Sequence, residues 1–110
     1  METLFYQELR ATISLFKKEL ALYFWRTKNQ HEVDFIAYGE DGFFAFEVFR
    51  SSRIRSEDLS SLEIFLEDFP SAQAYVIYGG TEERQFGKIR ALPFERALKT
   101  LPKLLCQNRH

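Results

Sequence analysis

The sequence predicts a single α/β domain, with a mixed five-stranded central sheet flanked by helices in the order α-β-β-β-α-β-β-α. Three short apolar segments between Leu22 and Phe49 are separated only by short polar turns, which is typical of antiparallel hairpins. A segment of helical periodicity then leads to another apolar segment, and such a crossover favours a parallel, right-handed strand pair. The length of 110 residues suits one domain with its own core.

The first half of the chain predicts one helix and three strands. The helix is expected from Glu2 to about Leu20, because apolar residues recur at close to the helical period. The aromatic and β-branched content then rises, which favours strands. The three strands are expected at 22–25, 32–38 and 43–49, with turns at 27–30 and 39–42.

The second half predicts a helix, two strands and a final helix. Ser56 is a good N-cap for a helix over 57–68, which Pro70 ends. Strands are expected at 72–78, buried on both faces, and at 86–92, with Gly87 as a weak point. A helix opens at Pro93 and is interrupted by Pro102. The domain is therefore expected over 1–105, followed by a loose tail at 106–110.

The composition indicates a cytoplasmic protein that does not contact a membrane. No apolar run is long enough to cross a bilayer, and charges break the first residues where a signal peptide needs an apolar segment. The single cysteine, Cys106, fits a reducing compartment. A net charge of −1 supplies no overall field for a polyanion, so nucleic acid would need a local basic patch. The first helix has no capping signal before it, which favours a start within a longer protein.

Two acids, Asp34 and Glu47, lie in expected strands that carry bulky apolar residues on both faces. Burying an unpaired carboxylate costs several kcal/mol or forces the group to take up a proton. Two carboxylates that converge from neighbouring strands can share a magnesium ion, which accepts one or two of them and keeps waters elsewhere. The alternative is a structural ion pair with an arginine such as Arg26.

The segments YFWRTKNQHEVDF, FEV, SSR and METLFYQELRA carry a family resemblance. An acid in one strand, followed in the next by glutamate, an apolar residue and lysine, is the pattern of the PD-(D/E)XK nuclease superfamily, which has the restriction-endonuclease-like fold. The chain more closely resembles the domain of unknown function found C-terminal to the ATPase module in bacterial and archaeal AAA-type ATP-binding proteins. Since the chain has no Gly-rich phosphate loop, the resemblance implies an ATPase module elsewhere in a longer chain or assembly.

The resemblance also assigns roles to particular residues. It implies that Asp34 and Glu47 bind the metal, magnesium or manganese in an active enzyme, and act as catalytic acids. Glu8 on the first helix would be an accessory catalytic acid, although a solvated helix residue is the simpler interpretation, and Glu32 is a neighbouring acid. Phe49 stands where the family has its lysine, and a phenyl ring can neither hold a positive charge nor donate a hydrogen bond. The expected activity is therefore impaired.

A local concentration of basic residues lies next to the two acids in sequence, and such a cluster would meet backbone phosphates of nucleic acid, with DNA favoured over RNA. The alternative is that these side chains offset the acidic helix that follows. The cluster consists of Arg26, Lys28, Arg50, Arg53 and Arg55.

Three functions follow from these observations. The favoured one is a nuclease-like accessory domain of an AAA-type ATPase that has lost its motif lysine and serves nucleic-acid binding or regulation. The second is a working metal-dependent nuclease with a relocated cation. The third is a structural or homodimerisation module without nucleic-acid contact.

Overall fold

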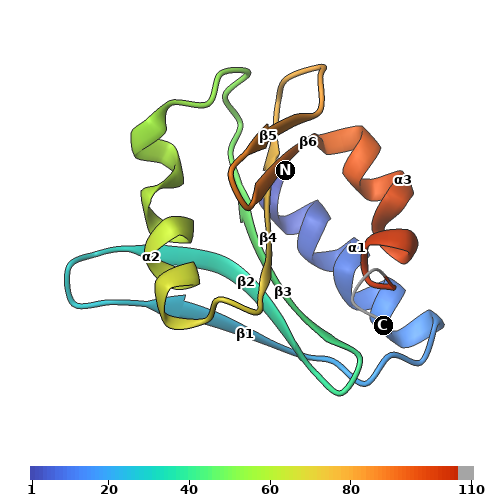
Figure 1. Ribbon diagram of the computed structural model, residues 1–110. Helices are drawn as coiled ribbons and strands as arrows, with labels where there is room; N and C mark the ends of the chain where they lie inside the picture. The colour runs from blue at the N-terminus through green and yellow to red at the C-terminus, as the bar shows by residue number, and fades with distance from the viewer. Residues whose placement is uncertain (107–110) are drawn as a thin grey trace.

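The computed structural model describes residues 1–106 as three α-helices, one short 3-10 helix and a six-stranded sheet (Figure 1). Of the expected tail at 106–110, the part after Cys106 lies outside the described residues. No helix of the described part is long and apolar enough to cross a membrane. The elements are α1 (Glu2–Leu15), β1 (Ala21–Arg26), β2 (Glu32–Gly39), β3 (Gly42–Val48), η1 (Ser56–Leu59), α2 (Ser60–Asp68), β4 (Gln73–Tyr78), β5 (Arg84–Phe86), β6 (Ile89–Pro93) and α3 (Phe94–Leu104).

The sheet has the strand order β1-β2-β3-β4-β6-β5 and is mixed. Strands β1, β2 and β3 form the expected antiparallel meander. Strand β3 pairs with β4 in parallel, as the helical crossover between them predicts, and β4 pairs with β6 in parallel. The mixed α/β class and the parallel central pair are therefore confirmed.

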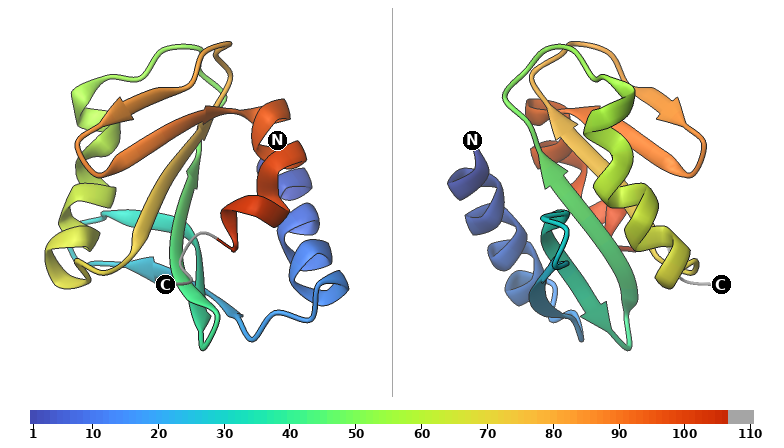
Figure 2. Two further views of the ribbon diagram at one scale, coloured as in Figure 1. Left: turned by 45° about the vertical axis from the view of Figure 1, so that its right-hand side comes forward. Right: turned by 90° about the vertical axis from the view of Figure 1, so that its left-hand side faces the viewer.

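Helices cover both faces of this sheet, so the core has two layers. Figures 1 and 2 show α2 on one face and α1 with α3 on the other. Under α2, Leu62 and Phe65 pack on Ala45 and Val76 of the central strands. The opposite layer is defined by side chains from α1, α3 and the same central strands. It includes Phe5, Leu9, Phe44, Phe46, Tyr75, Ile77 and Leu101.

The expected single strand at 86–92 is wrong, and the sheet has six strands instead of five. The chain turns at Gly87, whose φ of 61° lies in the left-handed region that glycine adopts without a steric penalty. Strands β5 and β6 therefore form an antiparallel hairpin around Gly87, which was expected to be a weak point within one strand. Strand β5 becomes one edge of the sheet, and β1 is the other.

Two helix boundaries also differ from expectation. Helix α1 ends at Leu15 because Lys17 turns into the left-handed region (φ 52°) and the Lys18 N–H closes back on the Ile13 carbonyl at 2.9 Å. Ser56 is the first residue of η1 instead of a cap, and the Asp58 carboxylate accepts the Arg55 N–H at 2.8 Å.

Pro102 does not interrupt the last helix, because α3 continues to Leu104. Leu101, Leu104 and Leu105 are all buried in the layer shared with α1. Packing of this apolar face outweighs the one helical hydrogen bond that proline cannot donate.

Candidate functional site

Asp34 and Glu47 lie where β2 and β3 separate. Regular pairing between these strands ends at Phe35 opposite Phe46. Just beyond it, Oδ2 of Asp34 accepts the backbone N–H of Val48 at 2.8 Å. A side-chain oxygen thus satisfies a strand donor that the ladder no longer reaches, and this contact fixes the Asp34 carboxylate next to the end of β3.

A β-bulge at the start of β2 helps to place Asp34. Tyr23 pairs with Ile36 but Trp25 pairs with Val33, so β2 contains one more residue than β1 over this interval. Val33 and Ile36 consequently both face the core under α2. Because a bulge re-aims the side chains on either side of it, Glu32, Asp34 and Ile36 do not follow the strict alternation of a regular strand.

Glu47 is a buried carboxylate with an unsatisfied oxygen. The residue is 9% exposed, and its Oε1 atom is buried with no hydrogen-bond partner among residues 1–106. The pKa of Glu47 is raised from 4.5 to about 8, mainly by burial and additionally by the nearby Asp34, Asp58 and Glu32 carboxylates, in that order. Only acids contribute to the electrostatic part of this shift, so no side chain of the described residues compensates the charge.

Asp34 has a smaller shift of the same kind. Its pKa is raised from 3.8 to about 6: burial is the largest cause, the Val48 N–H opposes the rise, and the charges of Glu2 and Glu32 add to it. Together with Glu47 and Asp58, these side chains form what we call the acid cluster (Glu2, Glu32, Asp34, Glu47 and Asp58). It draws on α1, β2, β3 and η1.

The structure does not bring Glu8 into this cluster. Glu8 is exposed on α1, whereas Glu2 at the start of the same helix lies close enough to Asp34 to raise its pKa. The sequence contained a signal for this, because Glu2 precedes the buried Phe5 by three residues and therefore shares its face of the helix. Glu2 is thus the helix acid that sequence reasoning missed.

The expected basic residues lie around the acids without neutralising Asp34 or Glu47. Arg26 pairs with Glu32 at 3.7 Å and Arg55 pairs with Glu57 at 3.9 Å, both on exposed surface. The structural ion pair between Arg26 and Asp34 or Glu47 is therefore not formed among residues 1–106. The remaining three basic residues are exposed and make no ion pair with any described residue: Lys28, Arg50 and Arg53.

Phe49 stands where the sequence resemblance predicts a lysine. The Phe49 ring packs against the core under α2, and its N–H donates to the Ile77 carbonyl at 2.8 Å. Within 1–106, no three or more His, Cys, Asp or Glu side chains are grouped closely enough to hold a metal by themselves. The ligands that the site offers are therefore two carboxylates, a number that magnesium accepts when waters or substrate oxygens complete its shell. The unpaired Oε1 of Glu47 fits such an ion, since a hard divalent cation prefers carboxylate oxygen.

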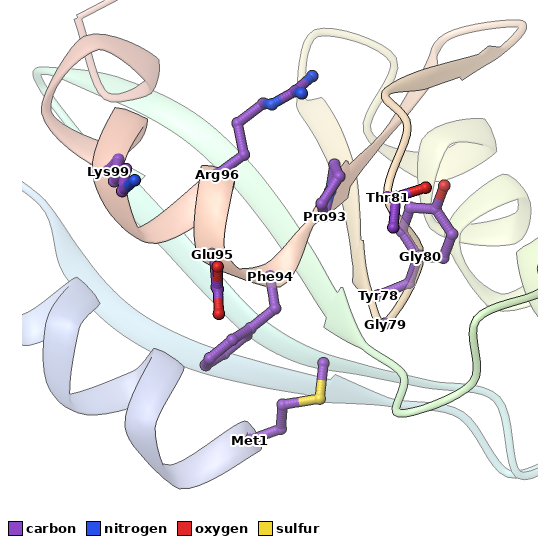
Figure 3. A pocket seen from close by; sticks show the side chains of 10 residues that line it. All are labelled: Met1, Tyr78, Gly79, Gly80, Thr81, Pro93, Phe94, Glu95, Arg96 and Lys99. Atoms are coloured by element: carbon purple, nitrogen blue, oxygen red, sulfur yellow. The ribbon is translucent and has the colours of Figure 1, made fainter.

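A cavity of about 540 Å³ opens beside the acid cluster, at the carboxyl ends of β4 and β6 (Figure 3). Its walls are the turn at 79–81, the start of α3 and Met1, which adjoins Glu2. Arg96 on this wall pairs with Glu83 at 3.6 Å. Neither Asp34 nor Glu47 lines the cavity, so the perturbed acids and this hollow are neighbours and not one site.

Comparison with known families gives one match. The model of a family described as a domain of unknown function (DUF4143) matches residues 1–97, which includes every residue of the acid cluster. No curated protein gives a significant match.

Proposed function

The chain belongs to the DUF4143 family, and we propose for it a nuclease-like function in which Asp34 and Glu47 hold a magnesium or manganese ion and surrounding basic residues contact nucleic acid. Its fold is proposed to be the restriction-endonuclease-like variant of the mixed α/β class. Hydrolysis is slow or lost, because Phe49 occupies the position of the motif lysine. The ATPase module proposed as its partner is supported by the sequence resemblance alone.

One observation carries the metal proposal: Glu47 has a buried oxygen without a partner among the described residues, and the charges that shift its pKa are all negative. A domain gains no stability from such an arrangement, since desolvation and like-charge repulsion both oppose ionisation. A divalent cation from solution reverses both effects. Val48 contributes by holding the Asp34 carboxylate through its N–H, which keeps that acid beside the end of β3.

The same geometry accounts for weak catalysis. A bound ion supplies a water of lowered pKa and neutralises charge on a phosphodiester. The motif lysine would stabilise the charge that develops on the phosphate, and the ring of Phe49 has no donor for this purpose. By analogy with the loss of one oxyanion-hole donor, its absence slows the chemical step by roughly 100- to 1000-fold.

Metal binding is tested by titrating manganese into the domain at about pH 8 and measuring heat and thermal stability. We expect saturable binding that Glu47→Gln abolishes and Glu8→Gln leaves unchanged, since Glu8 is outside the cluster. Binding is weaker near pH 6, because the acids must lose their protons before they can ligate. Equal binding by wild type and E47Q would refute the site.

Cleavage separates this proposal from the active-nuclease alternative. With single- and double-stranded DNA or RNA and magnesium or manganese, the wild type is expected to cleave no faster than Asp34→Ala or Glu47→Ala. Phe49→Lys returns an ammonium group to the face of β3 that carries Glu47 and is expected to give metal-dependent cleavage. Wild-type cleavage that disappears in both acid variants would establish the active nuclease instead.

Nucleic-acid contact is tested by measuring DNA affinity at low salt. Replacing Lys28, Arg50 and Arg53 by glutamine is expected to weaken binding by at least about 10-fold and to flatten its salt dependence. Glutamine at Lys99 and Lys103 of α3 is the matched control, because these exposed lysines lie on a different element. Equal losses in the two sets would mean that binding is not local to the acid cluster.

A further inference from the structure

The two edges of the sheet differ in a way that the proposed function does not explain. Strand β5 is three residues long, and its Arg84 and Gln85 are exposed. Short, charged edge strands resist pairing with another chain. Strand β1 at the other edge is six residues long and reads Ala-Leu-Tyr-Phe-Trp-Arg, with no charge before Arg26. It thus has none of the devices that protect β5.

Exposed aromatic rings are concentrated at this unprotected edge. Phe24 is 73% exposed and Tyr23 54% exposed in the middle of β1, and Tyr38 of the adjoining β2 is 53% exposed. Tyr23, Tyr38 and Phe69 also line a groove of about 400 Å³ between the edge strand and α2. The outer N–H and C=O groups of β1 lie beside these rings, because β1 pairs only with β2 among the described strands.

We propose that a second copy of this chain covers the edge, with β1 pairing antiparallel to its counterpart about a two-fold axis. The partner must supply an extended strand with apolar side chains and free hydrogen-bonding groups, and β1 itself meets this requirement. In a two-fold dimer the same surface of each copy forms the interface, so the β1 edges of both copies are paired at once. The sheets of the two copies then become continuous.

The amount of surface is sufficient for such a pair. At about 200 Å² for a whole aromatic side chain, the exposed parts of Tyr23, Phe24, Tyr38 and Phe69 represent roughly 400 Å² in each copy. This is about half of what each partner contributes to a standard interface, before the backbone and flanking side chains of a six-residue strand are included. Antiparallel pairing about the centre of β1 brings the Tyr23 and Phe24 rings of both copies together, and aromatic cross-strand pairs stabilise sheets.

The test is the molar mass of the whole chain by light scattering as a function of concentration. The expected result is twice the 13.1 kDa chain mass at micromolar concentration. Phe24→Lys, which puts like charges at the centre of the pair, is expected to raise the dissociation constant by at least about 100-fold. The matched controls are Gln85→Lys on the opposite edge and Leu15→Lys, another exposed apolar position, and both are expected to remain dimeric.

Hydrogen exchange provides a measurement that needs no variant. Amides of β1 are expected to exchange more slowly in a concentrated sample than in a dilute one, while β5 amides show no such change. A monomer at about 100 µM, or a dimer that F24K leaves intact, would overturn the proposal. Neither outcome bears on metal binding at Asp34 and Glu47, so this inference and the proposed function fail separately.

Discussion

Two carboxylates of this domain have opposite surroundings. Glu83, between β4 and β5, is partly exposed, yet it contacts both Arg90 and Arg96. Glu47 is almost completely buried, yet only Asp34, Asp58 and Glu32 contribute charge to its environment. The chain therefore pairs the more exposed acid with two arginines and leaves the largely buried one without an ion pair among residues 1–106. Stability alone does not explain that choice, whereas the metal ion that we propose at this site would.

The largest expected effect concerns the pH dependence of stability. The folded-state pKa of Glu47 is about 8, against 4.5 for an unperturbed side chain. The contribution of Glu47 to the free energy of unfolding is therefore fully present below about pH 4.5 and is lost as the pH rises through about 8. Denaturant unfolding should show Glu47→Gln to be more stable than wild type near pH 9 by about 4 kcal/mol, and about equal to it at pH 4. Glu83→Gln is the matched control and should show no such gain. A uniform effect of E47Q at both pH values would mean that Glu47 is not buried unpaired.

A smaller effect is expected at Asp34, where charge and hydrogen bonding can be separated. Asp34→Ala removes the acceptor of the Val48 N–H and should lower the free energy of unfolding by about 1 to 3 kcal/mol. Asp34→Asn keeps an oxygen that can accept the Val48 N–H, so its free energy of unfolding should fall clearly less. Metal binding should weaken in both variants. Equal destabilisation by the two substitutions would show that the carboxylate charge, and not the contact with Val48, holds the end of β3.

Substitution of Glu83 is expected to lower the free energy of unfolding by a still smaller amount. Its partners are partly exposed, and such ion pairs contribute about 0 to 1 kcal/mol. Glu83→Gln should therefore destabilise the domain slightly at low salt and not at all at about 1 M salt. A loss of stability above about 2 kcal/mol would mean that Glu83 behaves like a buried charge, and it would then no longer differ from Glu47 in this respect.

The smallest effects distinguish the two glutamates of α1. Glu2→Gln should lower the pKa of Asp34 from about 6, because a neighbouring negative charge is removed, and Glu8→Gln should leave it unchanged. Carboxyl resonances followed by NMR across a pH titration measure this directly. A change in the pKa of Asp34 caused by E8Q would instead support Glu8 as the accessory acid that the sequence resemblance indicated.

The sequence was most informative where short-range patterns decide the structure. Apolar segments and turn residues predicted the β1–β3 meander, and the crossover helix predicted the parallel pairing of β3 with β4. The hairpin at Gly87 was missed because one glycine can weaken a strand or end it, and only a preference for positive φ separates the two cases. The acids Asp34 and Glu47 were identified as anomalous for their strands. The contribution of Glu2 depends on where α1 docks, which no local pattern contains.

The position of the bulge in β2 was also beyond local patterns, because it depends on how two strands are aligned with each other. Val33 and Ile36 face the same core layer because β2 has one additional residue opposite β1. Strict alternation along β2 therefore does not describe the side chains on either side of Asp34.

Helices α1 and α3 cover the same face of the sheet, although they come from opposite ends of the described chain. A nascent chain that has left the ribosome only as far as β6 therefore lacks the part of this cover that α3 supplies over β4 and β6. Contacts between such distant segments form late, because a long loop must first be closed. Until Leu101 and Leu104 arrive, this face is a surface for chaperone binding or aggregation, so its folding is completed after most of the domain has been synthesised.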